Sequence, residues 1–331
     1  MTVAISVGAA AVSEGPEPTG KRGRRSARGG LDTPRSTRRA QTRLGILLVL
    51  PVMILVAVFF LLPLANAIYY AFVDFNGVNP NPEFVGFANF IELFQDPNLW
   101  PALKNNAIWI IIGTIAPLGI GLALALLMWN VGRGGIFYRV AFFLPFVLPM
   151  VAVGVVWSWI YDPVRGWLNQ ALAATGLGFL RTGWLGDPET ALYAVLATAI
   201  WATSGFIFVI LLAALRNVDT ELVDASRLDG ANTIQRLWYI ILPQIMPVFL
   251  MVTTITLVGG FSVFDIIFVM TGGGPAGATD VLGTLAYSEA FQLNRISYGT
   301  TIALVMTVLA IPFAVWLNRL QRRLSLQGTG A

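Results

Sequence analysis

The feature that most constrains the fold is a set of six long apolar segments, at about residues 44–73, 106–129, 140–161, 191–215, 244–270 and 297–318. An α-helix needs about 20 apolar residues to cross the hydrocarbon core of a bilayer. Only 11% of the 331 residues are charged, whereas soluble domains carry about 25%. The pattern therefore predicts an all-α integral membrane protein with six transmembrane helices.

The first apolar segment has some features of a signal peptide, because paired arginines precede it and a small-residue triplet follows its apolar part. Its apolar run extends from Leu44 to Leu64, longer than the usual signal core of about 7–15 residues. We therefore interpret it as an uncleaved span. Residues 1–43 are rich in Gly, Pro, Ser and Arg. This composition predicts a disordered basic tail that fixes the topology, or else a docking or regulatory arm.

Basic residues predict the orientation. If the N-terminus is inside, only Lys104, Arg165, Arg181 and Arg295 of the 21 Lys and Arg residues fall outside. The positive-inside rule then places both termini in the cytoplasm, and it explains the pI of about 9.6 without a nucleic-acid partner. The predicted domains are the basic cytoplasmic tail 1–43, a six-span domain 44–323 with a cytoplasmic loop at 216–243, and a short cytoplasmic tail 324–331.

The composition excludes much chemistry. The chain contains no cysteine and no histidine, so disulfides, Cys/His metal sites, thiol nucleophiles and histidine bases are excluded. A phosphate-binding loop requires a lysine within a G-x-x-x-x-G-K-[ST] pattern, and neither Lys21 nor Lys104 lies in one. We therefore expect no catalytic residue, no metal site and no cofactor in this chain.

The loop at 216–243 is long and patterned. Residues 221–242 predict two amphipathic helices that meet at Gly230, where glycine permits the backbone turn. Pro243 permits a bend where the chain re-enters the membrane. The apolar residues are spaced by three or four along each helix: Leu222, Ala225 and Leu228, then Ile234, Leu237 and Ile241. The acidic residues available for ion pairs and helix caps are Glu221, Asp224 and Asp229.

This loop resembles the coupling loop of type I ABC importer permeases, which has the pattern E-A-A, three residues, G, nine residues, I-x-L-P. The matching residues are Asp224, Ala225, Ser226, Gly230, Ile240, Leu242 and Pro243. Asp224 replaces the glutamate and Ser226 replaces the second alanine. Three further stretches are similar to the carbohydrate uptake branch: residues 84–90, Arg139 with residues 142–145, and residues 264–280 with the run Thr271-Gly272-Gly273-Gly274-Pro275.

The resemblance implies a type I ABC importer permease fold in a bacterial cytoplasmic (inner) membrane, which translocates a sugar, expected to be an oligosaccharide. It implies a second homologous permease subunit, two ATP-binding subunits that hold ATP and Mg, and an extracytoplasmic sugar-binding protein. The helix at about 221–229 would dock in an ATPase subunit, with Asp224 paired to an ATPase arginine, and ATPase closure would switch the spans as rigid bodies. The implied coupling residues are Asp224, Ala225, Ser226, Asp229, Gly230, Leu242 and Pro243.

Candidate substrate contacts come from helix geometry. Asp265 is the charged residue that we place within a span, where a carboxylate is costly and typically faces a cavity. Thr254 and Ser262 are predicted to share its helical face. Aromatic platforms suit sugars, and the candidates are Trp157 with Tyr161, and Trp201 with Ser204. A polar helix contact at Asp265 and an interfacial aromatic belt are the other interpretations.

The fifth apolar segment carries two backbone signals. The pair Gly259-Gly260 indicates either a kink or a close approach of two helices. The run from Thr271 to Pro275 cannot remain helical and predicts an outward-facing turn or re-entrant loop.

Two other function classes remain. An ion- or proton-coupled secondary transporter would require intramembrane carboxylates or a histidine relay, and this chain offers one such aspartate and no histidine. A membrane-embedded enzyme would require a metal cluster or a nucleophile paired with a base.

Overall fold

The computed structural model describes residues 35–129, 131–132 and 135–328. Within them, the regular structure is helical except for one antiparallel strand pair, β1 (Val73–Asp74) with β2 (Glu83–Phe84), in which Val73 lies opposite Phe84. The chain forms two units, Met1–Val58 and Phe59–Ala331. The first unit contains α1 (Arg35–Val56), and the π-helical turn η1 (Ala57–Leu61) follows.

Helix α1 corrects one predicted boundary. It begins at Arg35, inside the stretch 1–43 that we expected to be disordered. The residues after Pro34 include arginine, alanine and glutamine, which are good helix formers. Residues 1–34, which make up most of the predicted tail, lie outside the described part of the chain.

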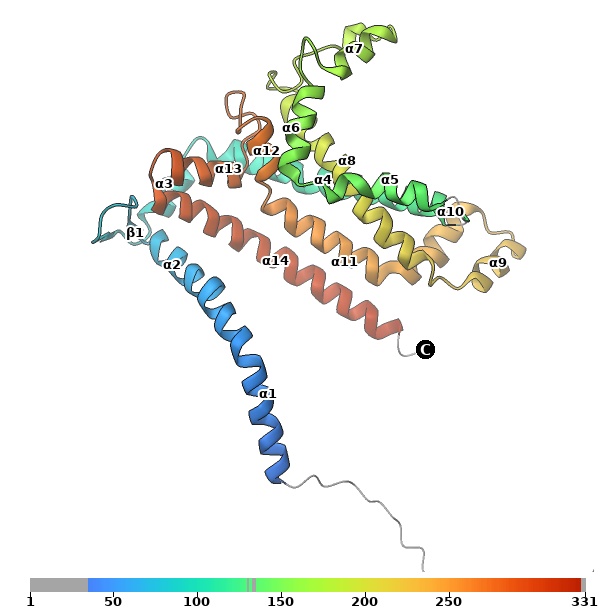
Figure 1. The fold of residues 1–331 in the computed structure, drawn as a ribbon, viewed down its shortest axis with the longest axis horizontal. Coiled ribbons are helices and arrows are strands. Elements are labelled where there is room, and N and C mark those ends of the chain that lie inside the picture. Colours follow the sequence, from blue (N-terminus) through green and yellow to red (C-terminus); the bar gives the residue numbers. More distant parts are fainter. Residues whose placement is uncertain (1–34, 130, 133–134, 329–331) are drawn as a thin grey trace, which may run out of the picture. The chain divides into compact units, whose positions relative to one another are not determined.

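The second unit is a bundle of long helices in which α4, α8, α11 and α14 run side by side (Figure 1). Helices α9 and α10 lie at one end of this bundle, and α3 and α13 lie at the other. Its helices are α2 (Leu62–Ala71), α3 (Ala88–Gln95), α4 (Leu99–Met128), α5 (Gly135–Val147), α6 (Met150–Ile160), α7 (Trp167–Ala174), η2 (Gly178–Leu180), α8 (Ala191–Leu215), α9 (Thr220–Leu228), α10 (Thr233–Arg236), η3 (Leu237–Ile241), α11 (Leu242–Phe261), α12 (Asp265–Met270), α13 (Leu282–Tyr287), η4 (Ser288–Gln292) and α14 (Ile296–Gly328).

Five helices in the described chain are long and apolar enough to cross a membrane, and the count rises to six if α5 and α6 form one span. These two helices are bent by 98°, so the predicted span at 140–161 is a broken span and not one continuous helix. Pro149 lies at the bend. It has no N–H for a helical hydrogen bond, and it disfavours helical backbone at Leu148. By contrast, α8 has the predicted bounds 191–215.

The fifth predicted span, 244–270, is also broken. Helix α11 ends at Phe261 and α12 begins at Asp265, with Ser262, Val263 and Phe264 between them. Thr254, Ser262 and Asp265 therefore do not share one helical face, contrary to our prediction. The helix runs through Gly259 and Gly260 and ends after them.

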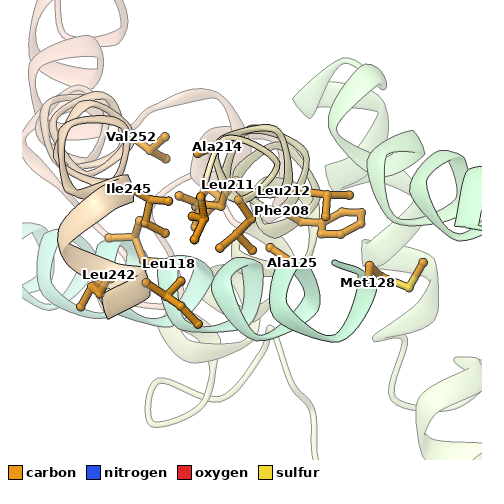
Figure 2. Close-up of a cluster of buried hydrophobic side chains, with 14 of the residues drawn as sticks. Leu118, Ala125, Met128, Phe208, Leu211, Leu212, Ala214, Leu242, Ile245 and Val252 are labelled. Atoms are coloured by element: carbon orange, nitrogen blue, oxygen red, sulfur yellow. The ribbon is translucent and has the colours of Figure 1, made fainter. Parts of the chain in front are cut away.

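The largest buried cluster joins α4, α8 and α11 (Figure 2). Leu118 and Ala125 of α4 contribute to it together with Phe208 and Leu211 of α8 and Ile245 of α11. Glycines bring α8 close to α4 and to α5: a Cβ on Gly121 of α4 would lie 2.5 Å from Ile207 Cγ2, and one on Gly205 of α8 would lie 1.8 Å from the carbonyl oxygen of Phe142 in α5. The bundle is therefore fixed by contacts too close for any side chain at these two positions.

Candidate functional site

The coupling hairpin, which we define as residues 216–243, is held in shape by its own side chains. Asp219 is the N-cap of α9, and its carboxylate accepts hydrogen bonds from the amides of Glu221 (2.9 Å) and Leu222 (3.4 Å). Asn232 and Gln235 form a capping box at α10, with side chain to backbone bonds of 2.9 and 2.8 Å. Such caps satisfy the amides that a helix start leaves unpaired. The first predicted helix is thus confirmed as α9, whereas the second predicted helix is the start of a helical segment that continues to Phe261.

Gly230 ends α9. Its φ is +81°, which glycine adopts without the penalty of other residues. The amide of Gly230 donates to the carbonyl of Arg227 (3.2 Å), and the amide of Ala231 donates to the carbonyl of Ser226 (3.0 Å). These two bonds form a Schellman motif. The predicted turn is therefore confirmed, and it directs the chain from α9 into α10.

Helix α9 buries one face and exposes the other. Val223 and Ser226 are buried, and Val223 belongs to the main apolar cluster of the bundle. The predicted apolar face points outward, because Leu222 is 54% exposed and Leu228 is 90% exposed. The second helix of the hairpin likewise exposes Ile234 and Tyr239. The hairpin is thus anchored to the bundle and presents apolar side chains to its surroundings.

Two polar contacts in the hairpin were not predicted. Asp224 pairs with Arg227 one turn later, at 2.7 Å, so its carboxylate already has a cation. Gln244 joins the two ends of the hairpin, because it accepts from the amide of Asp219 (2.9 Å) and donates to the carbonyl of Ile240 (3.1 Å).

Pro243 follows a π-helical turn. Residues Leu237–Ile241 form η3, and the same spacing recurs where η1 (Ala57–Leu61) precedes Pro63. The wider turn relieves the clash between a proline ring and the carbonyl four residues before it. Thr233–Phe261 is consequently one long helical segment, which connects the coupling hairpin to the break at Ser262.

A cavity of about 340 Å³ opens at that break. Its walls come from α4, α5, α6, α8, α11 and α12. Apolar side chains form most of the surface, among them Trp109, Phe146, Met150, Phe206 and Ile255. The polar side chains are Thr203, Thr256, Ser262 and Asp265. A cavity with apolar walls and a few converging polar groups is the usual form of a small-molecule site.

Of the seven predicted substrate contacts, Ser262 and Asp265 line this cavity. Thr254 donates to the carbonyl of Leu250 within its own helix (2.8 Å), and Ser204 donates to that of Trp201 (3.1 Å). A role for Thr254 and Ser204 in substrate contact stays a prediction.

The predicted aromatic residues lie together but are not among the residues that line the cavity. The ring of Trp157 lies 5.3 Å from the ring of Trp201 and 5.3 Å from that of Tyr161. The Tyr161 hydroxyl donates to the carbonyl of Ala194 at 3.1 Å. These contacts join α6 to α8, and a role in substrate contact stays a prediction.

The glycine pair has two different environments. A Cβ on Gly260 would lie 3.2 Å from Ile110 Cγ1, so this glycine permits the close approach of α11 to α4, as the packing interpretation predicts. Gly259 has no other atom within 4 Å of such a Cβ, and it lines the cavity.

The predicted end of the helix near Thr271 is confirmed, because α12 stops at Met270. Gly272 and Gly273 have φ of +60° and +91°. The hydroxyls of Thr271 and Thr279 lie 2.7 Å apart, and the Thr279 hydroxyl donates to the carbonyl of Gly274 (2.7 Å). The conspicuous run of threonine and glycine is thus a closed turn.

Sequence reasoning missed two adjacent asparagines in α4. Asn105 donates to the carbonyls of Ala278 (3.0 Å) and Asp280 (2.8 Å). Asn106 donates to the carbonyl of Gly260 (3.2 Å) and accepts from the amide of Leu282 (2.8 Å). Two amide side chains near the start of an apolar span are the signal that would have found them, since polar residues there commonly bond across helices.

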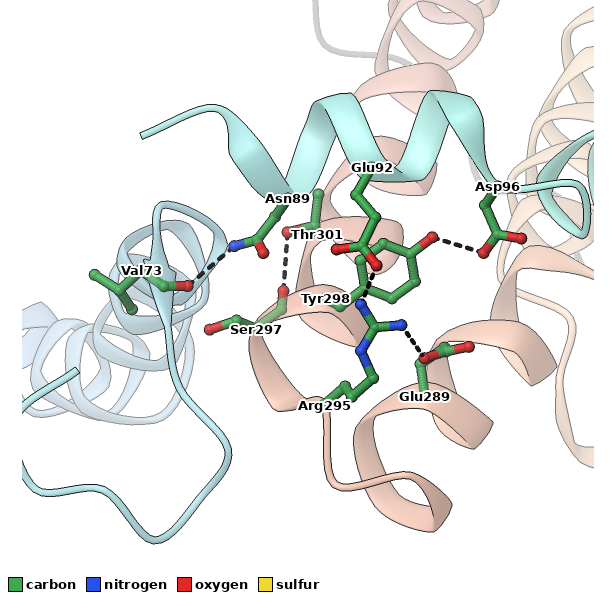
Figure 3. A network of polar contacts seen from close by, with 9 residues as sticks. All are labelled: Val73, Asn89, Glu92, Asp96, Glu289, Arg295, Ser297, Tyr298 and Thr301. Atoms are coloured by element: carbon green, nitrogen blue, oxygen red, sulfur yellow. Dashed lines mark hydrogen bonds and ion pairs between the residues drawn. The ribbon is translucent and has the colours of Figure 1, made fainter. Parts of the chain in front are cut away.

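A polar network at the far end of the bundle was also missed (Figure 3). Arg295 pairs with Glu289 (3.1 Å) and with Glu92 of α3. The hydroxyl of Tyr298 donates to Asp96 (2.6 Å). Burial raises the pKa of Glu289, and the charge of Arg295 opposes that rise. The network fastens α3 and η4 to the start of α14. It is structural in character.

Known proteins match most of this chain. A family model described as binding-protein-dependent transport system inner membrane component matches residues 115–326. A probable ABC transporter permease of Pyrococcus horikoshii is 34% identical over 82% of this chain and 94% of its own length. A diacetylchitobiose uptake system permease of Streptomyces coelicolor is 32% identical over 78% of this chain and 76% of its own.

The fold also has a solved counterpart. A chain in the crystal structure of a bacterial ABC transporter involved in the import of the acidic polysaccharide alginate matches with a TM-score of 0.76 and 24% identity. The match covers 88% of this chain and 99% of that one. The two share their fold. With the family model matched over residues 115–326 and relatives above 30% identity along most of its length, this chain belongs to the family of binding-protein-dependent transport system inner membrane components.

Proposed function

We propose that this chain is a permease subunit of an ATP-driven ABC importer for a sugar, namely an oligosaccharide delivered by an extracytoplasmic binding protein. Membership of the permease family supports the class of protein. Relatives named for diacetylchitobiose, for starch degradation products and for multiple sugars support the class of substrate. The observation that carries the proposal is the coupling hairpin, rigidly capped and apolar on its outward face.

The hairpin is suited to receive force. Its helix starts and its turn are fixed by Asp219, Gly230 and Asn232. Because capped helix ends do not fray, a displacement of α9 by a partner is transmitted to the rest of the hairpin. Leu222 and Leu228 supply apolar surface for a partner cleft. We infer that an ATP-binding subunit holding ATP and Mg docks here, on the cytoplasmic side, and that a second one docks on a homologous permease.

The cavity is suited to a weak sugar site. Sugars present apolar C–H faces and polar rims, and the cavity combines the rings of Trp109 and Phe206 with the hydroxyls of Thr203 and Ser262 and the carboxylate of Asp265. Ordinary hydrogen bonds to hydroxyls contribute about 1 kcal/mol each. A few of them hold a sugar in transit without trapping it.

The proposal includes both termini in the cytoplasm of a bacterium and six spans in its inner membrane. The distribution of basic residues supports this orientation. Counting α5 and α6 as one bent span gives the even number of crossings that it requires.

The test is purification of the tagged chain from its host in mild detergent, followed by mass spectrometry. We expect a P-loop ATPase and a second permease to accompany the chain. Leu228→Asp places a charge on the docking face and should lower ATPase recovery about tenfold or more, as loss of a central apolar contact does. Leu177→Asp, at an exposed leucine between α7 and η2, is the matched control and should change nothing.

Asp224→Ala should weaken docking while the chain remains inserted. Normal ATPase recovery from both Leu228→Asp and Asp224→Ala would exclude the hairpin as the docking site. A chain that purifies alone and drives uptake without ATP would instead favour the ion-coupled secondary transporter.

A further inference from the structure

Asn106 is placed at the break of the fifth span. It lies in α4 and is 3% exposed, and both ends of its amide are used. Its Nδ2 donates to the carbonyls of Gly260 (3.2 Å) and Phe261 (3.5 Å), the last two residues of α11. Its Oδ1 accepts from the amide of Leu282, the first residue of α13 (2.8 Å).

These backbone groups require a partner because the helices end there. In an unbroken helix the carbonyls of Gly260 and Phe261 would accept from the amides of Phe264 and Asp265. The break removes those donors, and Asn106 supplies a donor from another helix. The amide of Leu282 is one of the unpaired amides at a helix start, and Asn106 satisfies it too. One side chain thus caps the end of one helix and the start of another.

The location of this cap connects the coupling hairpin, the cavity and the turn around Thr271 and Thr279. Helix α11 is the far part of the segment Thr233–Phe261 that begins in the coupling hairpin. The break just beyond Phe261 lies at the cavity, which Ser262 and Asp265 line. Leu282 follows the closed turn around Thr271 and Thr279. Asn106 therefore contacts α11, and the segment that leaves the turn, at one point beside the cavity.

We propose that Asn106 is a positioning residue of the transport cycle, which fixes the break of the fifth span and passes movement of α11 to α13 and to the turn at 271–279. The inference rests on the proposed function, because it assumes that the coupling hairpin moves α11. Without the amide, the carbonyls of α11 and the amide of Leu282 lose their shared partner. In such a variant, ATP hydrolysis moves α11 without moving the turn at 271–279.

The chain offers a matched control one residue away. Asn105 is also buried and also bonds to backbone. Its acceptors, however, are the carbonyls of Ala278 and Asp280, between α12 and α13, and it does not bond to α11. Asn106→Leu removes the proposed link with a side chain of similar size. Asn105→Leu removes only the hydrogen bonds to Ala278 and Asp280. Asn106→Gln keeps a donor and an acceptor and serves as the conservative variant.

The first experiment measures sugar uptake and ATP hydrolysis by the whole complex in proteoliposomes. We expect Asn106→Leu to hydrolyse ATP but to lower the sugar transported per ATP about fivefold or more, the lower end of typical coupling between sites. Asn106→Gln should restore most of that ratio, and Asn105→Leu should retain it. An unchanged ratio in Asn106→Leu, or an equal loss in both leucine variants, would overturn the proposal.

The second experiment does not depend on transport. The chain has no cysteine, so spin labels at Met251→Cys in α11 and Ala276→Cys in the outer turn report the distance across the break in the purified chain. We expect Asn106→Leu to shift or broaden this distance, and Asn105→Leu and Asn106→Gln to preserve it. If Asn106→Leu does not assemble, the smaller Asn106→Ser should show the same shift. Identical distances in all variants would overturn the proposal, whereas a wild-type complex without uptake would refute only the proposed function.

Discussion

The coupling hairpin and the break of the fifth span lie at opposite ends of one helical segment, Thr233–Phe261, yet they are specified in different ways. In the hairpin, the bonds that begin and end the helices are local: Asp219, Gly230 and Asn232 bond to residues two or three positions away. At the break, the decisive partner, Asn106, is 154 residues away from Gly260. The coupling hairpin is thus shaped by local bonds, whereas the break of the fifth span depends on a bond from a helix far away in the sequence.

The largest effect should follow a substitution near the cavity that leaves α8 and α5 no room to pack against each other. A Cβ on Gly205 of α8 would lie 1.8 Å from the backbone oxygen of Phe142 in α5. Backbone cannot rotate away, so Gly205→Ala should destabilise the chain by about 3 kcal/mol or more, at the upper end of overpacking costs. The measurement is thermal unfolding in detergent.

The control for this change is Gly259→Ala, at a cavity-lining glycine whose Cβ would meet nothing within 4 Å. It should leave stability unchanged or raise it slightly, because alanine favours helix. Equal losses of stability in the two alanine variants would show that these glycines matter for helix flexibility and not for the close approach of two helices.

The second effect should be functional. Asp265 is exposed at the break and lines the cavity. Asp265→Asn removes a charged acceptor, whose hydrogen bonds are worth about 1.5–3 kcal/mol, and should lower sugar uptake about tenfold or more. Because the side chain is not part of the packed core, assembly should be normal. Loss of the complex, with no specific loss of uptake, would make Asp265 a structural contact.

The two regions also differ in how far sequence could predict them. The positions of the hairpin helices follow from apolar spacing, acidic residues and one glycine, all within a window of about one loop. The same spacing places Leu222, Ala225 and Leu228 on one face, but it does not reveal that this face points outward while Val223 and Ser226 are buried. What the pattern could not reveal is that Arg227 already pairs with Asp224, because an ion pair between neighbours and one to a partner use the same residues.

For the fifth span the apolar pattern was misleading. Residues 244–270 are predominantly apolar, and hydropathy carries no information on whether helical hydrogen bonds persist through Ser262 and Val263. At the break, Asn106 supplies a donor to the carbonyls that the missing helical turn leaves unpaired. Gly283 lets α13 pack closely there, because a Cβ on Gly283 would lie 2.7 Å from the carbonyl oxygen of Val263. The bend between α5 and α6 is different, since Pro149 in the sequence is a signal for it, whereas α5 continues through Pro145.

A smaller effect should separate stability from docking in the hairpin. Gly230 has a φ of +81° and open space around it. Gly230→Ala should therefore cost about 1 kcal/mol, the penalty of left-handed backbone for a residue with a Cβ. Gly176, with a φ of +79° and equal space, is a matched site in the α7 loop. Both variants should lower the unfolding temperature similarly, but only Gly230→Ala should reduce ATPase recovery.

The smallest effect concerns the exposed pair of Asp224 and Arg227, three residues apart on α9. Surface pairs of this kind contribute at most about 0.5 kcal/mol, so Arg227→Gln should hardly change the stability of the chain. It does release the carboxylate of Asp224. If that carboxylate binds an ATPase cation, Arg227→Gln should maintain or strengthen ATPase binding, whereas Asp224→Asn should weaken it. Binding of the purified ATPase subunit to each variant at low ionic strength distinguishes these outcomes, because screening by salt is then small. Equal weakening by both substitutions would mean that the ATPase recognises the intact pair, and Asp224 would then act through its place on α9 rather than as a lone acceptor.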